Sequence, residues 1–146
     1  MEGAFLPNKN KMLITYSGGK YNLLPRLFEL FPYHENFLEL FGGSGCVILN
    51  KTPCDGREVY NDINGDIANL FKVISDESLF SSFVGRVKYL PLVGKDQFLD
   101  YQRRLLSGEL KAVERAIATF YILNTSFSAR GKYVGRRPGK ETQKKF

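Results

Sequence analysis

The residues best suited to hold a ligand lie between Glu39 and Asp62. Glu39 interrupts an apolar run, and a turn with three glycines follows it, at Gly42, Gly43 and Gly45. Glycine permits positive φ and lets a ligand approach backbone amides without a Cβ in the way. Asp62 comes nineteen positions after Gly43, where an acid at the end of the next strand accepts hydrogen bonds from ribose hydroxyls. This spacing favours a nucleotide-binding site.

The elements that must position this site are two strands and two helices. The pattern predicts strands over 37–41 and 57–61, a helix that starts near Val47, and a second helix over 64–74. The glycine spacing differs from the dinucleotide fingerprint GxGxxG, which argues against a nicotinamide or flavin cofactor. Two alternatives stay open, namely an ordinary glycine-rich turn and a helix N-cap role for Asp62.

A second group of candidate residues precedes a helix near the N-terminus. Residues 12–15 could form a short strand, and Gly18, Gly19 and Lys20 follow it. Leucine and phenylalanine recur at helical spacing over 21–31, with Pro25 near the first turn, where a missing N–H costs little. Amides at a helix start, together with an ammonium group, favour a carboxylate or a phosphate.

The composition bounds the class of protein. The 146 residues suit about one domain, and 43% of them are hydrophobic, as in a folded protein. No apolar run approaches the roughly 18 residues of a membrane span, and no signal-peptide pattern opens the chain. Cys46 and Cys54 show no metal-ligand spacing, and His34 is the single histidine, so we expect reduced thiols, no metal site and a cytoplasmic location.

Basic residues are concentrated toward the C-terminus. Residues 1–100 hold ten Lys/Arg against twelve Asp/Glu, whereas residues 101–146 hold eleven against three. We expect short helices over 75–92 and longer ones over 95–106 and 109–123, followed by a basic loop or hairpin over 124–138. This charge distribution favours a polyanionic partner, and a merely solvated tail is the alternative.

Three of these segments, in this order, resemble motifs of the Dam-like DNA adenine methyltransferases. Residues 16–20 look like the aromatic-x-Gly-Gly-Lys segment, 39–45 like the E-x-F-x-G-x-G turn, and 61–64 like the N-D-I-N signature. The resemblance implies S-adenosyl-L-methionine as cofactor. It also implies which residues contact that cofactor: Tyr16, Gly18, Gly19, Lys20, Glu39, Phe41, Gly42, Gly43, Gly45, Asp62 and Ile63.

The same resemblance extends to a DNA-binding part. Residues 95–137 are similar to the family's recognition insert, and Leu123 to Phe127 match its Leu-Asn-x-x-x-Phe segment. The implied partner is double-stranded DNA, contacted by Asn124, Arg130, Lys132, Arg136 and Arg137. The expected fold is α/β, an incomplete Rossmann-like methyltransferase sheet with a helical DNA-recognition insert. The expected divisions are 1–75 for the cofactor, 76–137 for the insert and 138–146 for a basic tail.

The family's catalytic D/N-P-P-Y/F/W segment is absent from the sequence, because no two prolines are adjacent. We therefore expect a family member truncated before its catalytic motif and inactive alone. The alternative is a non-enzymatic regulator or inhibitor, or one half of a split enzyme. Two confident strands leave open sheet edges, so we also expect a homo-oligomer or a completing partner chain.

Overall fold

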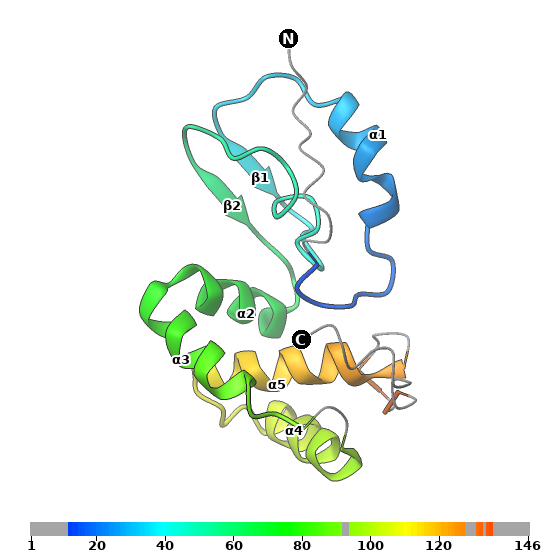
Figure 1. Ribbon diagram of the computed structural model, residues 1–146, viewed down its shortest axis with the longest axis vertical. Coiled ribbons are helices and arrows are strands. Elements are labelled where there is room, and N and C mark those ends of the chain that lie inside the picture. The colour runs from blue at the N-terminus through cyan, green and yellow to red at the C-terminus, as the bar shows by residue number, and fades with distance from the viewer. Residues whose placement is uncertain (1–11, 92–93, 128–130, 133, 136–146) are drawn as a thin grey trace.

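The computed structural model describes residues 12–91, 94–127, 131–132 and 134–135 of a mixed α/β chain. Figure 1 shows the sheet and α1 in one half and helices α2 to α5 in the other. In chain order the elements are η1 (Tyr21–Leu23), α1 (Leu24–Glu29), β1 (Phe37–Glu39), β2 (Glu58–Tyr60), α2 (Gly65–Ser75), α3 (Glu77–Val87), α4 (Lys95–Ser107) and α5 (Ala112–Thr125).

The two expected strands pair in parallel, with Leu38 opposite Val59 and Glu39 opposite Tyr60. Both strands are shorter than predicted. The chain already turns at Leu40, whose carbonyl accepts a hydrogen bond from the Asn61 side chain rather than from a strand backbone. Leu38 and Val59 are 53% and 47% exposed, whereas Glu39 is buried. Because parallel sheets are normally covered on both faces, one face of this sheet is unusually open.

The helix predicted near Val47 is wrong, because residues 44–50 form a series of turns. Two helix-like hydrogen bonds remain, from the Leu49 N–H to the Gly45 carbonyl and from the Lys51 N–H to the Val47 carbonyl, each at 2.9 Å. The neighbouring Ile48 N–H instead donates to Oε2 of Glu39, also at 2.9 Å. The carboxylate at the end of β1 thus holds the chain that follows the glycine turn.

Residues 12–15 form no strand, which corrects that prediction. Ile14 is fully buried all the same, so the segment, which bends at residues 13 and 14, contributes to the core. The helix predicted over 21–31 is confirmed as η1 followed by α1, with Pro25 in the first turn of α1. Leu24 and Phe28 of α1 pack with Cys46 and Val47 of the glycine turn.

The predicted helices of the second half are also confirmed. α2 begins after Asn64, whose side chain accepts hydrogen bonds from the N–H groups of Asp66 and Ile67. The N-cap of this helix is therefore Asn64 and not Asp62. Where short helices were expected over 75–92, the structure has one helix, α3, capped by the Asp76 side chain.

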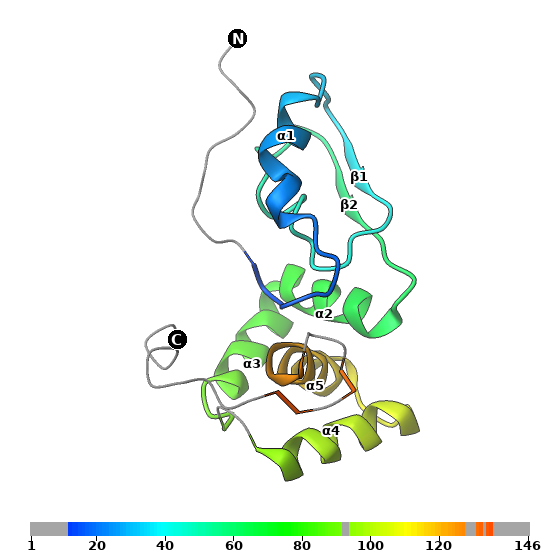
Figure 2. The same cartoon turned by 90° about the vertical axis from the view of Figure 1, so that its right-hand side faces the viewer.

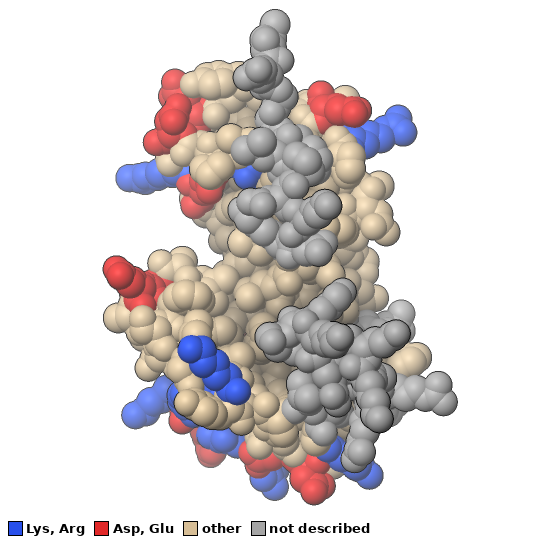
Figure 3. Space-filling view, viewed as in Figure 1, with Lys and Arg blue, Asp and Glu red and all other residues tan. Residues whose placement is uncertain are grey.

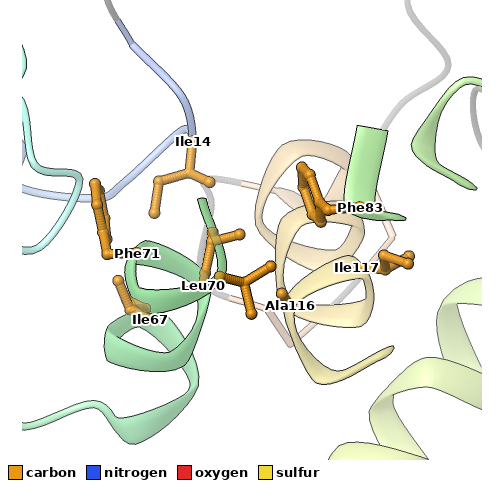
Figure 4. Packing of buried hydrophobic residues seen from close by; sticks show 8 residues of the cluster. Ile14, Ile67, Leu70, Phe71, Phe83, Ala116 and Ile117 are labelled. Carbon is orange, nitrogen blue, oxygen red and sulfur yellow. The ribbon is translucent and has the colours of Figure 1, made fainter. Parts of the chain in front are cut away.

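Helix α5 is the centre of the helical half. It packs against α2, α3 and α4, which surround it in the end-on view of Figure 2. The main core joins both halves, as Figure 4 shows, and comprises Ile14, Ile67, Leu70, Phe71, Val73, Phe83, Ala116 and Ile117. This core includes residues from both sides of position 75, and the division into three parts stays a prediction.

Candidate functional site

The carboxyl ends of the two strands meet at Asp62. Its Oδ2 accepts a hydrogen bond from the Gly43 N–H at 2.7 Å, and its Oδ1 accepts one from the Asn64 N–H at 2.8 Å. Asp62 therefore ties the glycine turn after β1 to the start of α2. In open α/β sheets, ligands bind at this edge, outside the carboxyl ends of the strands.

Aromatic rings fill the space that the glycines leave. A Cβ on Gly42 would overlap the ring of Tyr60, and one on Gly45 would overlap the ring of Phe71. A Cβ on Gly43 would lie 3.0 Å from Cε1 of Tyr16. Gly43 and Gly45 also have positive φ, of 52° and 65°. These glycines are therefore required by the packing of the protein itself, a reason the sequence reading did not include.

Tyr60 and Phe71 are the site residues that the sequence reading missed. Their rings stack with centroids 4.0 Å apart, and the Tyr60 hydroxyl donates to the Gly43 carbonyl at 2.7 Å. Burial raises the pKa of Tyr60, and the nearby carboxylates Asp62 and Glu39 add to this shift. The hydroxyl therefore stays protonated and available as a donor. In the sequence, the position of Tyr60 directly before the Asn61-Asp62 pair was the signal that could have identified it as a site residue.

A lysine and a buried glutamate form the charged corner of the site. Lys20 Nζ lies 3.9 Å from Oε1 of Glu39 and donates to the Phe41 carbonyl at 2.8 Å. Within the described residues, Oε1 of Glu39 is buried and has no hydrogen-bond partner. Burial raises the pKa of Glu39, against the opposing effects of the Ile48 N–H and of Lys20. A buried carboxylate oxygen without a hydrogen bond in this position calls for a donor from outside the described residues.

The structure brings most of the predicted cofactor residues to one edge of the sheet. Tyr16 lies against Gly43, and the Gly19 N–H donates to the Tyr16 carbonyl at 3.2 Å. Gly18 has a φ of 80° and open space around it. Phe41 and Ile63 are 78% and 99% exposed, so neither has a packing role within the described chain.

The predicted DNA-contacting residues are only partly within the described chain. Arg130, Arg136 and Arg137 lie outside the described residues, and Lys132 is exposed. Asn124 is exposed too, but its amide forms hydrogen bonds with Thr15 and Leu13. These DNA contacts therefore stay predictions.

The chain after α5 turns back on itself at the predicted position of the hairpin. Ser126 forms an antiparallel bridge with Val134, and the Gly135 N–H donates to the Thr125 carbonyl at 2.7 Å. The Gln102 side chain of α4 donates to the Gly131 carbonyl. Gly131, Val134 and Gly135 are thereby held beside the end of α5.

Several basic residues of the helical half are engaged in ion pairs. Arg115 Nε lies 2.6 Å from Oδ1 of Asp66, and Arg103 and Arg104 both pair with Asp100. On the face shown in Figure 3, basic and acidic side chains alternate along the helical half. The described helices thus carry mixed charge, and the positive excess belongs to the chain after Phe127.

A separate ion pair joins a buried lysine to a glutamate at the start of β2. The Lys51 side chain is 2% exposed, pairs with Glu58 and lies 3.2 Å from Sγ of Cys54. Burial would raise the pKa of Glu58, but hydrogen bonds from Lys51 and the Cys54 N–H outweigh it and lower that pKa. This cluster connects 51–54 to the strand and lies outside the site.

Three features of the described residues bear on other classes of site. Cys46 and Cys54 are free thiols. In the same residues no three His, Cys, Asp or Glu side chains gather as metal ligands would. None of the described helices has the length and apolar character needed to cross a bilayer.

A parallel strand pair that ends in a glycine turn and an acid is typical of nucleotide-binding α/β proteins. Comparison with known families is more specific. Residues 16–137 match the D12 class N6 adenine-specific DNA methyltransferases. The chain belongs to this family, and the resemblance read from its motifs is confirmed.

Individual relatives show how much of the family this chain represents. It is 27% identical to the DNA adenine methylase of Haemophilus influenzae over 129 residues, which is 86% of this chain and 44% of the relative. It is 35% identical to the DNA adenine methylase of Escherichia coli K12 over 66 residues, 45% of this chain and 23% of the relative. A third match is the DNA N-6-adenine-methyltransferase of Escherichia phage P1, 28% identical over 68 residues, 47% of this chain and 9% of the relative. The chain thus spans less than half the length of these relatives.

Proposed function

We propose that the edge formed by residues 16–20, 39–45 and 62–63 binds S-adenosyl-L-methionine, and that the chain provides the cofactor- and DNA-binding part of an adenine-N6 methyltransferase. The observation that carries the proposal is the buried Oε1 of Glu39, which lacks a donor in the described chain. An α-ammonium group would supply that donor. A carboxylate left unpaired in a buried site otherwise costs free energy.

The charged corner suits the amino-acid end of the cofactor. Glu39 would accept from the ammonium group, and Lys20 would pair with the carboxylate while keeping its place beside Glu39. Asp62 would accept from the ribose hydroxyls, since each of its oxygens has a further lone pair beyond the N–H that it already binds. The exposed Phe41 and Ile63 offer apolar surface for the adenine ring. The cofactor supplies the methyl group.

The family membership supports the finer fold and the second ligand. A two-stranded parallel sheet beside α1, followed by α2, suits part of a Rossmann-like methyltransferase sheet, and α3 to α5 suit its DNA-recognition insert. Double-stranded DNA would be bound by the basic chain that follows α5.

We further propose that these 146 residues transfer no methyl group by themselves. An enzyme that methylates adenine in DNA extrudes the base into a pocket that holds it and polarises its amine. The sequence has no Asp-Pro or Asn-Pro pair to supply such a pocket. Incorporation of labelled methyl into DNA by the purified chain, above a blank without protein, would overturn this part.

The cofactor proposal is tested by calorimetry with two ligands. S-adenosylmethionine carries the amino-acid end, and 5′-methylthioadenosine lacks it. We expect Glu39→Gln to weaken the affinity for S-adenosylmethionine on the order of tenfold and to leave the affinity for 5′-methylthioadenosine unchanged, because the lost hydrogen bond is to the ammonium group. Glu77→Gln, at an exposed position on α3, is the matched control. If the Glu39→Gln and Glu77→Gln variants bound S-adenosylmethionine with equal affinity, the proposed role of Glu39 would be contradicted.

A further inference from the structure

The Asn124 side chain joins two parts of the chain that are more than 100 residues apart. Its Oδ1 accepts hydrogen bonds from the N–H of Thr15 at 3.1 Å and from the Thr15 hydroxyl at 3.3 Å. Its Nδ2 donates to the carbonyl of Leu13 at 3.4 Å and to that of Phe120 at 3.0 Å. The amide of one side chain thus pairs with the Leu13 carbonyl and the Thr15 N–H, on either side of Ile14. A neighbouring parallel β-strand would bind the same two groups.

The segment that Asn124 holds leads directly into the candidate cofactor site. Ile14, between the two paired residues, is fully buried in the main core, as Figure 4 shows. Tyr16, which follows Thr15, lies against Gly43, and its carbonyl accepts a hydrogen bond from the Gly19 N–H. Lys20 follows and reaches Glu39. A shift of residues 13–15 would therefore move the ring and the ammonium group that form one side of the site.

Asn124 itself is held by the end of α5, at the base of the hairpin. Its Nδ2 bond to Phe120 fixes the amide against the last turn of the helix. The next two residues, Thr125 and Ser126, begin the hairpin contacts with Gly135 and Val134. The amide is therefore anchored to the helical half and reaches across to the other half.

The geometry points to Asn124 as a positioning residue for the cofactor segment 13–20, a role that rests on the proposed function for its consequence in binding. The amide substitutes for the missing strand partner of residues 13–15. Burial of Ile14 keeps the segment in the core, and the two backbone bonds determine its direction and register. Without them, Tyr16 and Lys20 would sample several positions relative to Gly43 and Glu39.

The test combines hydrogen exchange with ligand binding. In Asn124→Ala we expect the amides of 13–20 to exchange on the order of tenfold faster, while those of α2 and α3 keep their rates. Asn124→Asp retains the oxygen that accepts from Thr15 but has no donor for the Leu13 and Phe120 carbonyls, so it should restore only part of the protection. Asn69→Ala is the matched control, because it removes a partly exposed Asn side chain that donates to the Ala112 carbonyl elsewhere. Gln102→Ala removes the contact between α4 and the Gly131 carbonyl, and it should leave the exchange rates of 13–20 unchanged.

Affinity for S-adenosylmethionine is the second measurement. We expect it to fall severalfold in Asn124→Ala and not in Asn69→Ala, at equal melting temperatures. Faster exchange of 13–20 without measurable cofactor binding in any variant would support the positioning role and contradict the proposed function. Unchanged exchange of 13–20 in Asn124→Ala would overturn the inference, whatever the proteins bind.

Discussion

The N–H of Gly43 donates to the Asp62 carboxylate at 2.7 Å, across nineteen positions of sequence. The bond joins the turn after β1 to the end of β2, so the acid shapes the glycine turn as well as facing the ligand edge. Asp62 also receives the Asn64 N–H, which places the N-cap of α2. One carboxylate therefore controls how two elements leave the sheet.

Replacing Asp62 should affect both folding and cofactor binding. In Asp62→Ala the Gly43 N–H loses its acceptor, and the ribose hydroxyls lose theirs. We expect a loss of about 1–3 kcal/mol in the free energy of unfolding and a loss of similar size in S-adenosylmethionine binding. Denaturant unfolding and calorimetry measure the two separately. Asp55→Ala, at an exposed position, is the control. Equal losses of stability and of binding in Asp55→Ala and Asp62→Ala would refute the role of Asp62 in both folding and binding.

Glu39 should make both stability and binding depend on pH. Its pKa is raised by burial from the ordinary value of 4.5, so the folded chain binds the proton more tightly than the unfolded chain. The free energy of unfolding should therefore fall as pH rises from about 4.5 to the raised pKa. Cofactor affinity should rise over the same window, because an ammonium group requires the ionised carboxylate. Melting curves and calorimetry at several pH values check this, and Glu39→Gln should remove both trends.

Two glycines should respond oppositely to alanine. Gly45 has a φ of 65°, and a Cβ there would overlap the Phe71 ring, so Gly45→Ala should destabilise the fold by about 2–5 kcal/mol. Gly85 lies in α3 with open space around it, so Gly85→Ala should stabilise by about 0.5–1 kcal/mol. Chemical denaturation of both variants gives the comparison. A neutral Gly45→Ala would mean that the ring moves aside without cost.

DNA binding should be weak, non-specific and strongly dependent on salt. If Arg130, Lys132, Arg136 and Arg137 neutralise four phosphates, log K against log salt should have a slope of about −3.6. Fluorescence anisotropy of a labelled duplex gives the slope, and alanine at all four positions should bring this slope close to zero. Arg103→Ala should leave it unchanged, because that side chain pairs with Asp100. An affinity independent of salt would exclude phosphate contacts by this segment.

The open face of the sheet should cause self-association. Leu38 and Val59 lie opposite each other and are about half exposed, so a second copy or a completing chain would bury them. We expect oligomers in sedimentation at micromolar concentration, and a shift toward monomer in Leu38→Lys. A parent chain that sediments as a monomer and melts cooperatively would show that the face needs no cover.

Local patterns were sufficient for most of the secondary structure. Helices α2, α4 and α5 follow from apolar spacing and, for α2, from the cap at Asn64, because both signals depend on residues close in sequence. The strands and their parallel pairing follow from the glycine turn and the acid after it. The predicted helix near Val47 is replaced by turns, in which the Ile48 N–H donates to Glu39, nine positions away. That bond depends on the fold and not on local propensity.

The sequence by itself determined the family and the order of the motifs, and it predicted the residues that a cofactor would meet. Tertiary structure alone decided what the glycines accommodate, since Tyr60 and Phe71 approach them from β2 and α2. It also decided the environment of Ile14 and the pairing of its neighbours with Asn124. Motifs record which residue types are needed along the chain, whereas a ring against a glycine or an amide across 109 positions depends on how distant elements pack.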